Sequence, residues 1–194
     1  MLELELKAVV SEPDALRARL LEAGASPGFH GVMRDRRLDR DGALGSRDEV
    51  LRLRRYEPVE GAATEEVGWK GPTRVSDGYK ARRELGARLS PGDSLEEILA
   101  ALGFTEVHAI DRHVELYQIA GGDARIEWYP DLDTLVEVEG APAAIERITS
   151  LSGIAREQFR ADPLDWFVAD YERRTGRTAR LRLARGEEPA HWPR

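Results

Sequence analysis

Charged and apolar side chains alternate along the first ten residues of the chain. Glu3, Glu5 and Lys7 take odd positions, and the positions between them are leucines. Successive side chains of a β-strand point to opposite faces, so this pattern predicts a strand with one charged face and one apolar face. The pattern returns at residues 135–139, where two glutamates alternate with valines. Two such strands near opposite ends of the domain favour neighbours across a closed sheet.

Six further segments between these two also have the composition of strands and are bounded by turn residues. They are residues 30–40, 49–56, 65–72, 79–89, 104–119 and 124–129. Gly121-Gly122 indicates a hairpin turn between the last two. Helical spacing and helix-start residues predict four helices. These cover about residues 13–24, 94–102, 142–151 and 164–174.

The order of these elements predicts an α+β fold. We expect a closed eight-stranded antiparallel β-barrel, a tunnel, with the helices packed outside. Residues 1–175 are expected to form this single domain, including the C-terminal helices. Residues 176–194 are basic and then rich in proline and glutamate, which predicts a flexible tail.

The alternation leaves two arrangements of the barrel open. Either the apolar faces fill the interior and the charges face solvent, or the charges line the interior and the helices cover the apolar faces. The apolar stripes of the helices favour the second arrangement, because they need a hydrophobic surface to cover. The charged face would then carry Glu3, Glu5, Lys7, Arg52, Arg54, Lys70, Lys80, Arg82, Glu84, Arg112, Glu127, Glu137 and Glu139.

Composition narrows the class of protein. The chain has 194 residues and a net charge of −7, which argues against a general nucleic-acid binder. The absence of cysteine excludes disulfides, thiolate metal sites and a cysteine nucleophile. We see no signal peptide and no apolar run long enough for a membrane span, so a cytoplasmic protein without membrane contact is expected. The four histidines show no metal-binding spacing in the sequence.

A lumen holding charges of both signs would be costly if it were dry. It becomes favourable if a polyanion enters together with divalent cations. Arginine and lysine bind phosphates, and carboxylates bind Mg²⁺ or Mn²⁺, which bridge phosphate oxygens. The chemistry that this arrangement favours is phosphoryl or nucleotidyl transfer.

Five segments, in order and spacing, resemble the CYTH superfamily, the triphosphate tunnel metalloenzymes. They are the ExExK segment 3–7, then residues 51–54, 69–72, 82–84 and 136–139. The resemblance spans residue 1 to about 140. Within the superfamily, the chain is most similar to the class IV adenylate cyclase and thiamine triphosphatase branch. It implies an eight-stranded tunnel closed around a triphosphate, and a homodimer is a family-level expectation.

The resemblance also implies roles for individual residues. Lys7 and Glu5 would be catalytic, with Lys7 contacting phosphate or orienting the nucleophile. The implied phosphate-binding residues are Lys7, Arg52, Arg54, Lys70, Arg82 and Arg112. The implied ligands for Mg²⁺ or Mn²⁺ are Glu3, Glu5, Glu84, Glu127, Glu137 and Glu139.

The chain departs from the common pattern of this family at four positions. Gly86 and Val114 stand where many members carry an acid and an arginine, Arg112 replaces a lysine, and Glu127 replaces an aspartate.

Three functions stay open. The first is metal-dependent hydrolysis of a triphosphate such as ATP, thiamine triphosphate or inorganic triphosphate. The others are cyclisation of ATP to cyclic AMP and pyrophosphate, and binding of a triphosphate or polyphosphate without turnover.

Overall fold

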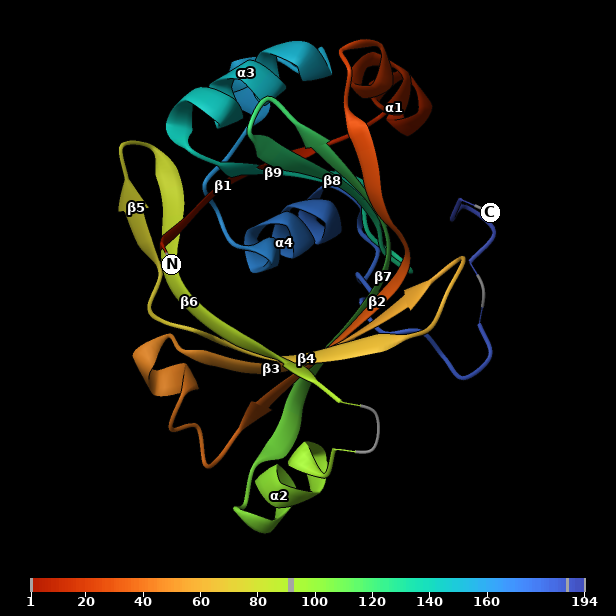
Figure 1. Ribbon diagram of the computed structural model, residues 1–194. Helices are drawn as coiled ribbons and strands as arrows, with labels where there is room; N and C mark the ends of the chain where they lie inside the picture. The colour runs from red at the N-terminus through yellow and green to blue at the C-terminus, as the bar shows by residue number, and fades with distance from the viewer. Residues whose placement is uncertain (1, 91–92, 188, 194) are drawn as a thin grey trace.

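The strands of this protein close into a barrel. The computed structural model describes residues 2–90, 93–187 and 189–193, with only the backbone described for residues 2 and 3. Neighbouring strands pair in the order β1-β9-β8-β7-β2-β3-β4-β6, and a further pairing of β1 with β6 completes the ring (Figure 1). All the pairings are antiparallel. The predicted eight-stranded barrel of the α+β class is therefore confirmed.

The elements follow the predicted order, with one addition. The barrel strands are β1 (Leu2–Val9), β2 (Ser26–Asp39), β3 (Val50–Pro58), β4 (Thr64–Lys70), β6 (Tyr79–Leu89), β7 (Thr105–Ile119), β8 (Gly122–Trp128) and β9 (Leu135–Gly140). The helices are α1 (Pro13–Glu22), α2 (Leu95–Ala101), α3 (Pro142–Ser152) and α4 (Leu164–Thr175), with short 3₁₀ turns η1 (Gly45–Arg47) and η2 (Arg156–Gln158). A short strand that was not predicted, β5 (Arg74–Ser76), pairs with the start of β6.

Helix α3 covers the apolar outer face of β1, β9 and β8, and α1 packs beside α3 (Figure 1). Leu20 of α1 and both Ile145 and Ile148 of α3 are fully buried there. They belong to one hydrophobic cluster with outward-facing strand residues such as Leu6 and Val138. The apolar faces therefore point outward beneath helices, as expected, and the charged faces of these strands point into the barrel.

The β7–β8 hairpin brings its strands very close to α3. Ala120 and Gly121 form the two-residue turn, and both have positive φ, as a tight hairpin turn requires. Gly122 is already the first residue of β8. A Cβ atom at Gly122 would lie 2.5 Å from the Glu139 carbonyl oxygen and 3.1 Å from Cδ1 of Ile148. Glycine at this position lets the helix pack against the hairpin.

The C-terminal part of the chain packs against one end of the barrel. In Figure 1, α4 is seen through the opening of the ring of strands. Phe167 and Tyr171 of α4 are buried in a second hydrophobic cluster with Tyr129 and Leu135. Beyond α4, the backbone of Arg180 exchanges two hydrogen bonds with that of Asp131, at 2.9 and 3.0 Å.

The segment after α4 also reaches β7. The Asp111 backbone N–H donates to the Leu181 carbonyl at 2.7 Å, and Trp192 packs against the first hydrophobic cluster. The described part of residues 176–194 is thus bonded to the barrel. The domain boundary at residue 175 and the flexibility of the tail stay predictions.

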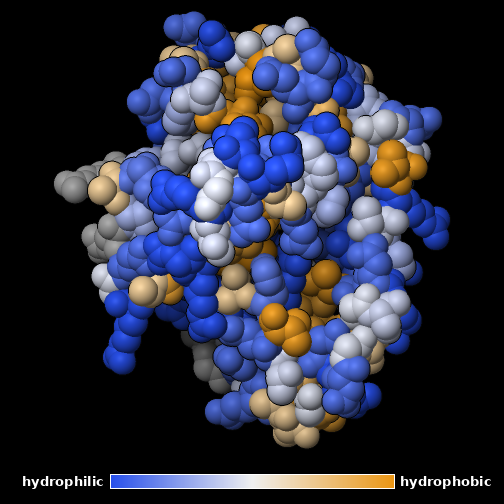
Figure 2. All heavy atoms as spheres, turned by 180° about the vertical axis from the view of Figure 1, so that it is seen from behind, coloured by the Kyte–Doolittle hydropathy of each residue, from blue (hydrophilic) through white to orange (hydrophobic). Residues whose placement is uncertain are grey.

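The outer surface is largely hydrophilic. Figure 2 shows mostly polar side chains on the side opposite to Figure 1, with hydrophobic side chains in small separate groups. Exposed large hydrophobic residues such as Val75 and Val107 come from different strands. Among the described residues, no helix is both long enough and apolar enough to cross a membrane.

We expect Ile145→Ala to lower the free energy of unfolding by about 2–5 kcal/mol, because it removes fully buried methyl and methylene groups between α3 and the barrel. Urea denaturation of the purified full chain measures this change. The matched control is Ile98→Ala on α2, whose side chain is 53% exposed and which should change stability by less than about 0.5 kcal/mol. Equal losses in the two variants would contradict the assignment of α3 to the core.

Candidate active site: a charged cavity inside the barrel

The inward faces of the strands enclose a cavity of about 380 Å³. Alternation on β1 places Glu5 and Lys7 in its wall, and the register sets their neighbours. Glu5 lies opposite Lys80 on β6 and Glu139 on β9, while Lys7 lies opposite Glu137. Nine basic and six acidic side chains line the cavity, whereas the whole chain has a net charge of −7. The basic ones are Lys7, Arg37, Arg52, Arg54, Lys70, Lys80, Arg82, Arg112 and Arg125, and the acidic ones are Glu5, Asp35, Asp48, Glu127, Glu137 and Asp165.

Three carboxylates meet where β1 and β9 pair. Oxygen atoms of Glu5, Glu137 and Glu139 lie within 4.8 Å of one another, and each residue is 6–7% exposed. Cations surround them. Lys7 Nζ is 2.7 Å from Glu5 and also contacts Glu137, and Arg125 donates to Glu137 at 2.8 Å and contacts Glu139. The cluster is therefore an acidic centre held together by basic neighbours.

The neighbouring cations keep Glu5 and Glu137 ionised. Burial and the nearby Glu137 both raise the pKa of Glu5. The lysines Lys7, Lys80 and Lys70 lower it by more than this, so the net pKa is about 2. Burial also opposes ionisation of Glu137, yet Lys7 and Arg125 hold its pKa well below the usual value. In return, the two carboxylates raise the pKa of Lys7 despite its burial. At neutral pH this end of the cavity presents anionic oxygens beside a fixed ammonium group.

A buried aspartate organises the arginines on the other side of the cavity. Asp35 of β2 accepts two hydrogen bonds from Arg54, at 2.6 and 2.8 Å, and a third from Arg112 at 3.1 Å. Asp35 is 3% exposed. Burial raises the pKa of its carboxyl group, but Arg54 and Arg112 lower it well below the usual range. Asp35 therefore acts as an internal anion for two of the predicted phosphate-binding residues.

Arg52 is less completely satisfied than its neighbours. Its Nε is buried, and no hydrogen-bond partner among the described residues reaches it. Its other nitrogens lie 3.4 Å from Glu66 and 3.8 Å from Asp35. Burial and the adjacent Arg54 lower the pKa of Arg52. A buried donor without an acceptor beside a cationic neighbour is the environment that an anion would stabilise.

Glu127 forms an ion pair on the basic side of the cavity. It accepts from Arg112 at 2.8 Å and from the Tyr129 hydroxyl at 2.6 Å. Lys70 and Glu84 contact each other across β4 and β6. Glu127 and Glu84 are thus in ion pairs outside the cluster formed by the other carboxylates.

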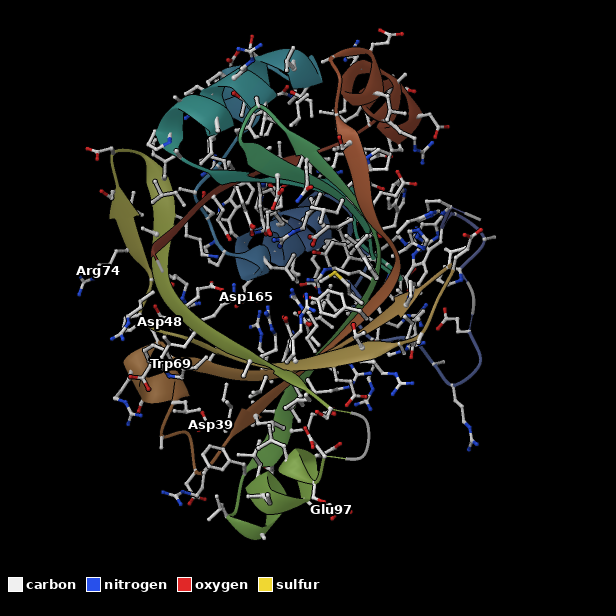
Figure 3. The ribbon with its side chains drawn as sticks, in the orientation of Figure 1. Asp39, Asp48, Trp69, Arg74, Glu97 and Asp165 are labelled. Carbon is white, nitrogen blue, oxygen red and sulfur yellow. The ribbon has the colours of Figure 1, made fainter. Side chains whose placement is uncertain are left out.

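The loop before β3 and the start of α4 complete the wall. Arg82 donates to the backbone carbonyls of Gly71 and Asp48, both at 2.6 Å, so its guanidinium is held by the loops. Figure 3 shows Asp165, near the beginning of α4, inside the ring of strands. Burial lowers the pKa of Arg37, while Asp165 opposes that shift.

The residues of the acidic cluster fit a hard divalent cation. Mg²⁺ and Mn²⁺ are bound through carboxylate oxygens, often by one or two carboxylates together with substrate phosphates. Glu5, Glu137 and Glu139 supply convergent anionic oxygens, and the cavity contains no softer ligand among its described side chains. The basic residues beside the cluster are of the types that bind phosphate.

Most of the residues singled out in the sequence come together in this cavity. All six predicted phosphate-binding residues line it: Lys7, Arg52, Arg54, Lys70, Arg82 and Arg112. Of the six predicted metal ligands, Glu5, Glu137 and Glu139 form one cluster, and Glu84 and Glu127 lie in separate ion pairs. The side chain of Glu3 lies outside the described residues, and its backbone pairs with that of Arg82.

Sequence reasoning missed several members of the site. Asp35 and Arg37 lie on β2, where four charged residues in succession hide the alternation. Arg125 shares a strand face with Glu127, which was a usable signal, but its partners on β9 depend on the strand register. Asp165 reaches the cavity only because α4 docks there.

The fold is shared with solved structures that differ widely in sequence. The chain matches no known family model and no curated protein. The PH1819 protein of Pyrococcus horikoshii matches with a TM-score of 0.71 and 21% identity, over 87% of this chain and 98% of that one. A protein of Vibrio parahaemolyticus proposed to be an adenylate cyclase matches with a TM-score of 0.73 and 15% identity, over the same shares.

A third similar structure is HpAC1 of Hippeastrum, which was proposed to be an adenylyl cyclase and whose structure is described as revealing a dominant triphosphatase activity. It matches with a TM-score of 0.59 and 15% identity, over 87% of this chain and 95% of that one. At these identities the likeness concerns the fold. Together with the closed ring of strands, it confirms the barrel fold that the resemblance in the five sequence segments implied.

Proposed function

We propose that this protein is an enzyme that hydrolyses a triphosphate inside the barrel with the help of Mg²⁺ or Mn²⁺. The observation that carries the proposal is the meeting of two complementary sites in one cavity. The ionised carboxylates of Glu5 and Glu137, with Glu139 beside them, lie together at one side, and Arg52, Arg54 and Arg112 lie on the other. The cavity, about 380 Å³, is within the range of about 300–1,000 Å³ typical for small-molecule sites.

The basic side chains would bind and orient the phosphate chain. Arginines present planar forks that match phosphate oxygens, and their burial strengthens such contacts. Glu5, Glu137 and Glu139 would hold the divalent cation, which supplies positive charge against the phosphate oxygens. Lys7, which contacts both Glu5 and Glu137, would donate to a phosphate oxygen next to that cation.

Hydrolysis needs little from the protein beyond positioning and charge. A water oxygen forms a bond to the terminal phosphorus, and the bond from that phosphorus to the bridging oxygen breaks. The leaving diphosphate keeps the electron pair, and the water gives up a proton. Arg54 and Arg112 would stabilise the charge that develops on the diphosphate.

Cyclisation of ATP is a second candidate, because three of the similar structures are of proteins proposed to be adenylate cyclases. In that reaction the ribose 3′-oxygen bonds to the α-phosphorus, pyrophosphate leaves and the hydroxyl proton is released. A third candidate is binding without turnover. It is supported by Gly86 and Val114, where the chain departs from the family pattern. It is also supported by Asp35, which already accepts hydrogen bonds from Arg54 and Arg112.

We expect the full chain to release orthophosphate and a diphosphate when incubated with inorganic triphosphate, thiamine triphosphate or ATP and Mg²⁺ or Mn²⁺. Chromatography of the products identifies the reaction and the preferred substrate. Glu5→Gln should lower kcat at least about 100-fold, because it removes an anionic oxygen from the proposed cation site. The matched control, Glu97→Gln on exposed α2, should retain the wild-type rate.

The other outcomes of this assay are distinct. Cyclic AMP with pyrophosphate, lost in Glu5→Gln, would replace hydrolysis by cyclisation. Tight triphosphate binding with no product from any substrate would leave a binding protein. A rate that Glu5→Gln does not change would exclude the acidic cluster from the reaction.

We expect Asp35→Asn to strengthen the binding of inorganic triphosphate in the absence of divalent cations by about tenfold. The substitution keeps the shape of the side chain but frees two buried arginines to bind phosphate. The free protein should become less stable by about 3–5 kcal/mol, since the arginines lose their buried counter-ion. Calorimetric titration and urea denaturation measure the two effects. Weaker binding in a folded Asp35→Asn variant would show instead that Asp35 positions the arginines for the substrate.

A further inference from the structure

A second cluster of metal-ligand side chains lies on the outer side of the barrel. His30 of β2 lies opposite Glu115 of β7 in the strand register, and His113 precedes Glu115 by two residues on the same strand face. Arg112, next to His113, points into the cavity, so these three side chains point away from it. We propose that His30, His113 and Glu115 form a binding site for a late first-row divalent metal ion, with Zn²⁺ as the expected occupant.

The three ligand atoms are close enough to converge on one ion. One atom from each side chain lies within 4.8 Å of the other two, and His30 Nε2 is 4.0 Å from Glu115 Oε1. The two imidazole rings meet edge to face, with 4.9 Å between their centroids. A tetrahedral ion with bonds of about 2.0–2.1 Å sets its ligand atoms roughly 3.4 Å apart, so small side-chain rotations suffice.

Both imidazole rings have a nitrogen without a hydrogen-bond partner among the described residues. His113 is 4% exposed, and Nε2 of His113 and Nε2 of His30 are buried. Within the described residues, no hydrogen-bonding group reaches either atom. Leaving a buried polar nitrogen unpaired costs about 1–3 kcal/mol. A metal ion between the rings would satisfy both nitrogens at once.

The Glu115 carboxylate is oriented and still has a free position. Arg17 of α1 donates to Oε2 at 2.8 Å and to Oε1 at 2.7 Å, and the Tyr117 hydroxyl donates to Oε2 at 2.8 Å. A carboxylate has about four lone-pair sites, so one remains, on Oε1, the oxygen nearer His30. Arg17 also pairs with Asp14 at 2.6 Å, which offsets its charge. Such supporting hydrogen bonds fix metal ligands in known sites.

The ligand types select the metal. Imidazole nitrogens favour Zn²⁺, Cu²⁺ or Ni²⁺ over Mg²⁺ and Ca²⁺. A cavity of about 550 Å³ beside the cluster, lined by His30 and Glu115, gives an entry path and room for a water as fourth ligand.

The position suggests what the ion would do. It would link β2 to β7 directly beneath the C-terminal segment, since the His113 and Trp192 rings have centroids 6.1 Å apart. Binding would therefore stabilise the packing of that segment on the barrel. This role is separate from the reaction proposed for the interior, and neither depends on the other.

The test is a titration of the full chain with Co²⁺, a spectroscopic substitute for Zn²⁺, in excess Mg²⁺ to occupy the carboxylates inside the barrel. We expect one equivalent to bind with the visible absorption of a four-coordinate site, and Zn²⁺ to displace it. His30→Gln and His113→Gln should each weaken binding at least tenfold. His108→Gln is the matched control, because His108 also has a buried, unpartnered Nε2 but lies in neither cluster, and it should bind as the wild type does.

Three results would overturn the proposal. The first is that the wild type does not bind Co²⁺. The second is that His30→Gln binds Co²⁺ as tightly as the wild type. The third is that binding survives His30→Gln but is lost in Glu137→Gln, which would place the ion inside the barrel. The His30 side chain is 41% exposed, so His30→Gln should fold and decides the question even if His113→Gln does not. As a second readout, Zn²⁺ should raise the Tm of the wild type but not of His30→Gln.

Discussion

Charges of both signs inside a closed barrel are stable only when each has a partner, because removing an ion from water costs several kcal/mol. Here a continuous network meets that condition: Arg54 and Arg112 share Asp35, and Arg112 also binds Glu127. The partners come from four different strands, so the network requires the observed strand order and register. A slip of one residue would turn the charged faces toward α1 and α3 and the leucines inward. The ion pairs and the helices therefore specify the same arrangement.

Under the proposed function, the same pairing would prepare the cavity for a polyanion. The arginines are fixed before any ligand arrives, so little side-chain entropy remains to be lost on binding. A phosphate entering the cavity would replace Asp35 as the hydrogen-bond acceptor of the arginines, whose side chains are already ordered. Such an exchange would make an acid at the centre of the proposed phosphate site compatible with binding, since the buried arginines need a counter-ion when the cavity holds only water.

How far the sequence predicts this structure depends on the contrast between the two faces of each strand. On β1 and β9, leucine or valine alternates with charge, and both the strands and their inward faces follow directly. On β2, residues 34–37 are all charged, so the sequence cannot tell Asp35 from the outward Arg36, which pairs with Asp111. The docking of α4 and the pairing of Arg125 with β9 are long-range contacts that local patterns do not contain. The metal identity, the substrate and the oligomeric state predicted from the resemblance stay predictions.

Strand β7 illustrates how one segment can supply two chemistries. Arg112 points inward to the basic side of the cavity, and its neighbour His113 points outward to an imidazole and a carboxylate. The inner carboxylates are ionised and surrounded by cations, which suits hard ions that share their ligands with phosphate. The outer nitrogens are buried and unpaired, which suits a softer ion held by the protein. His30 and His113 are 83 positions apart in the chain. Only the β2–β7 pairing brings them together, so no spacing rule applied to the sequence would have identified them.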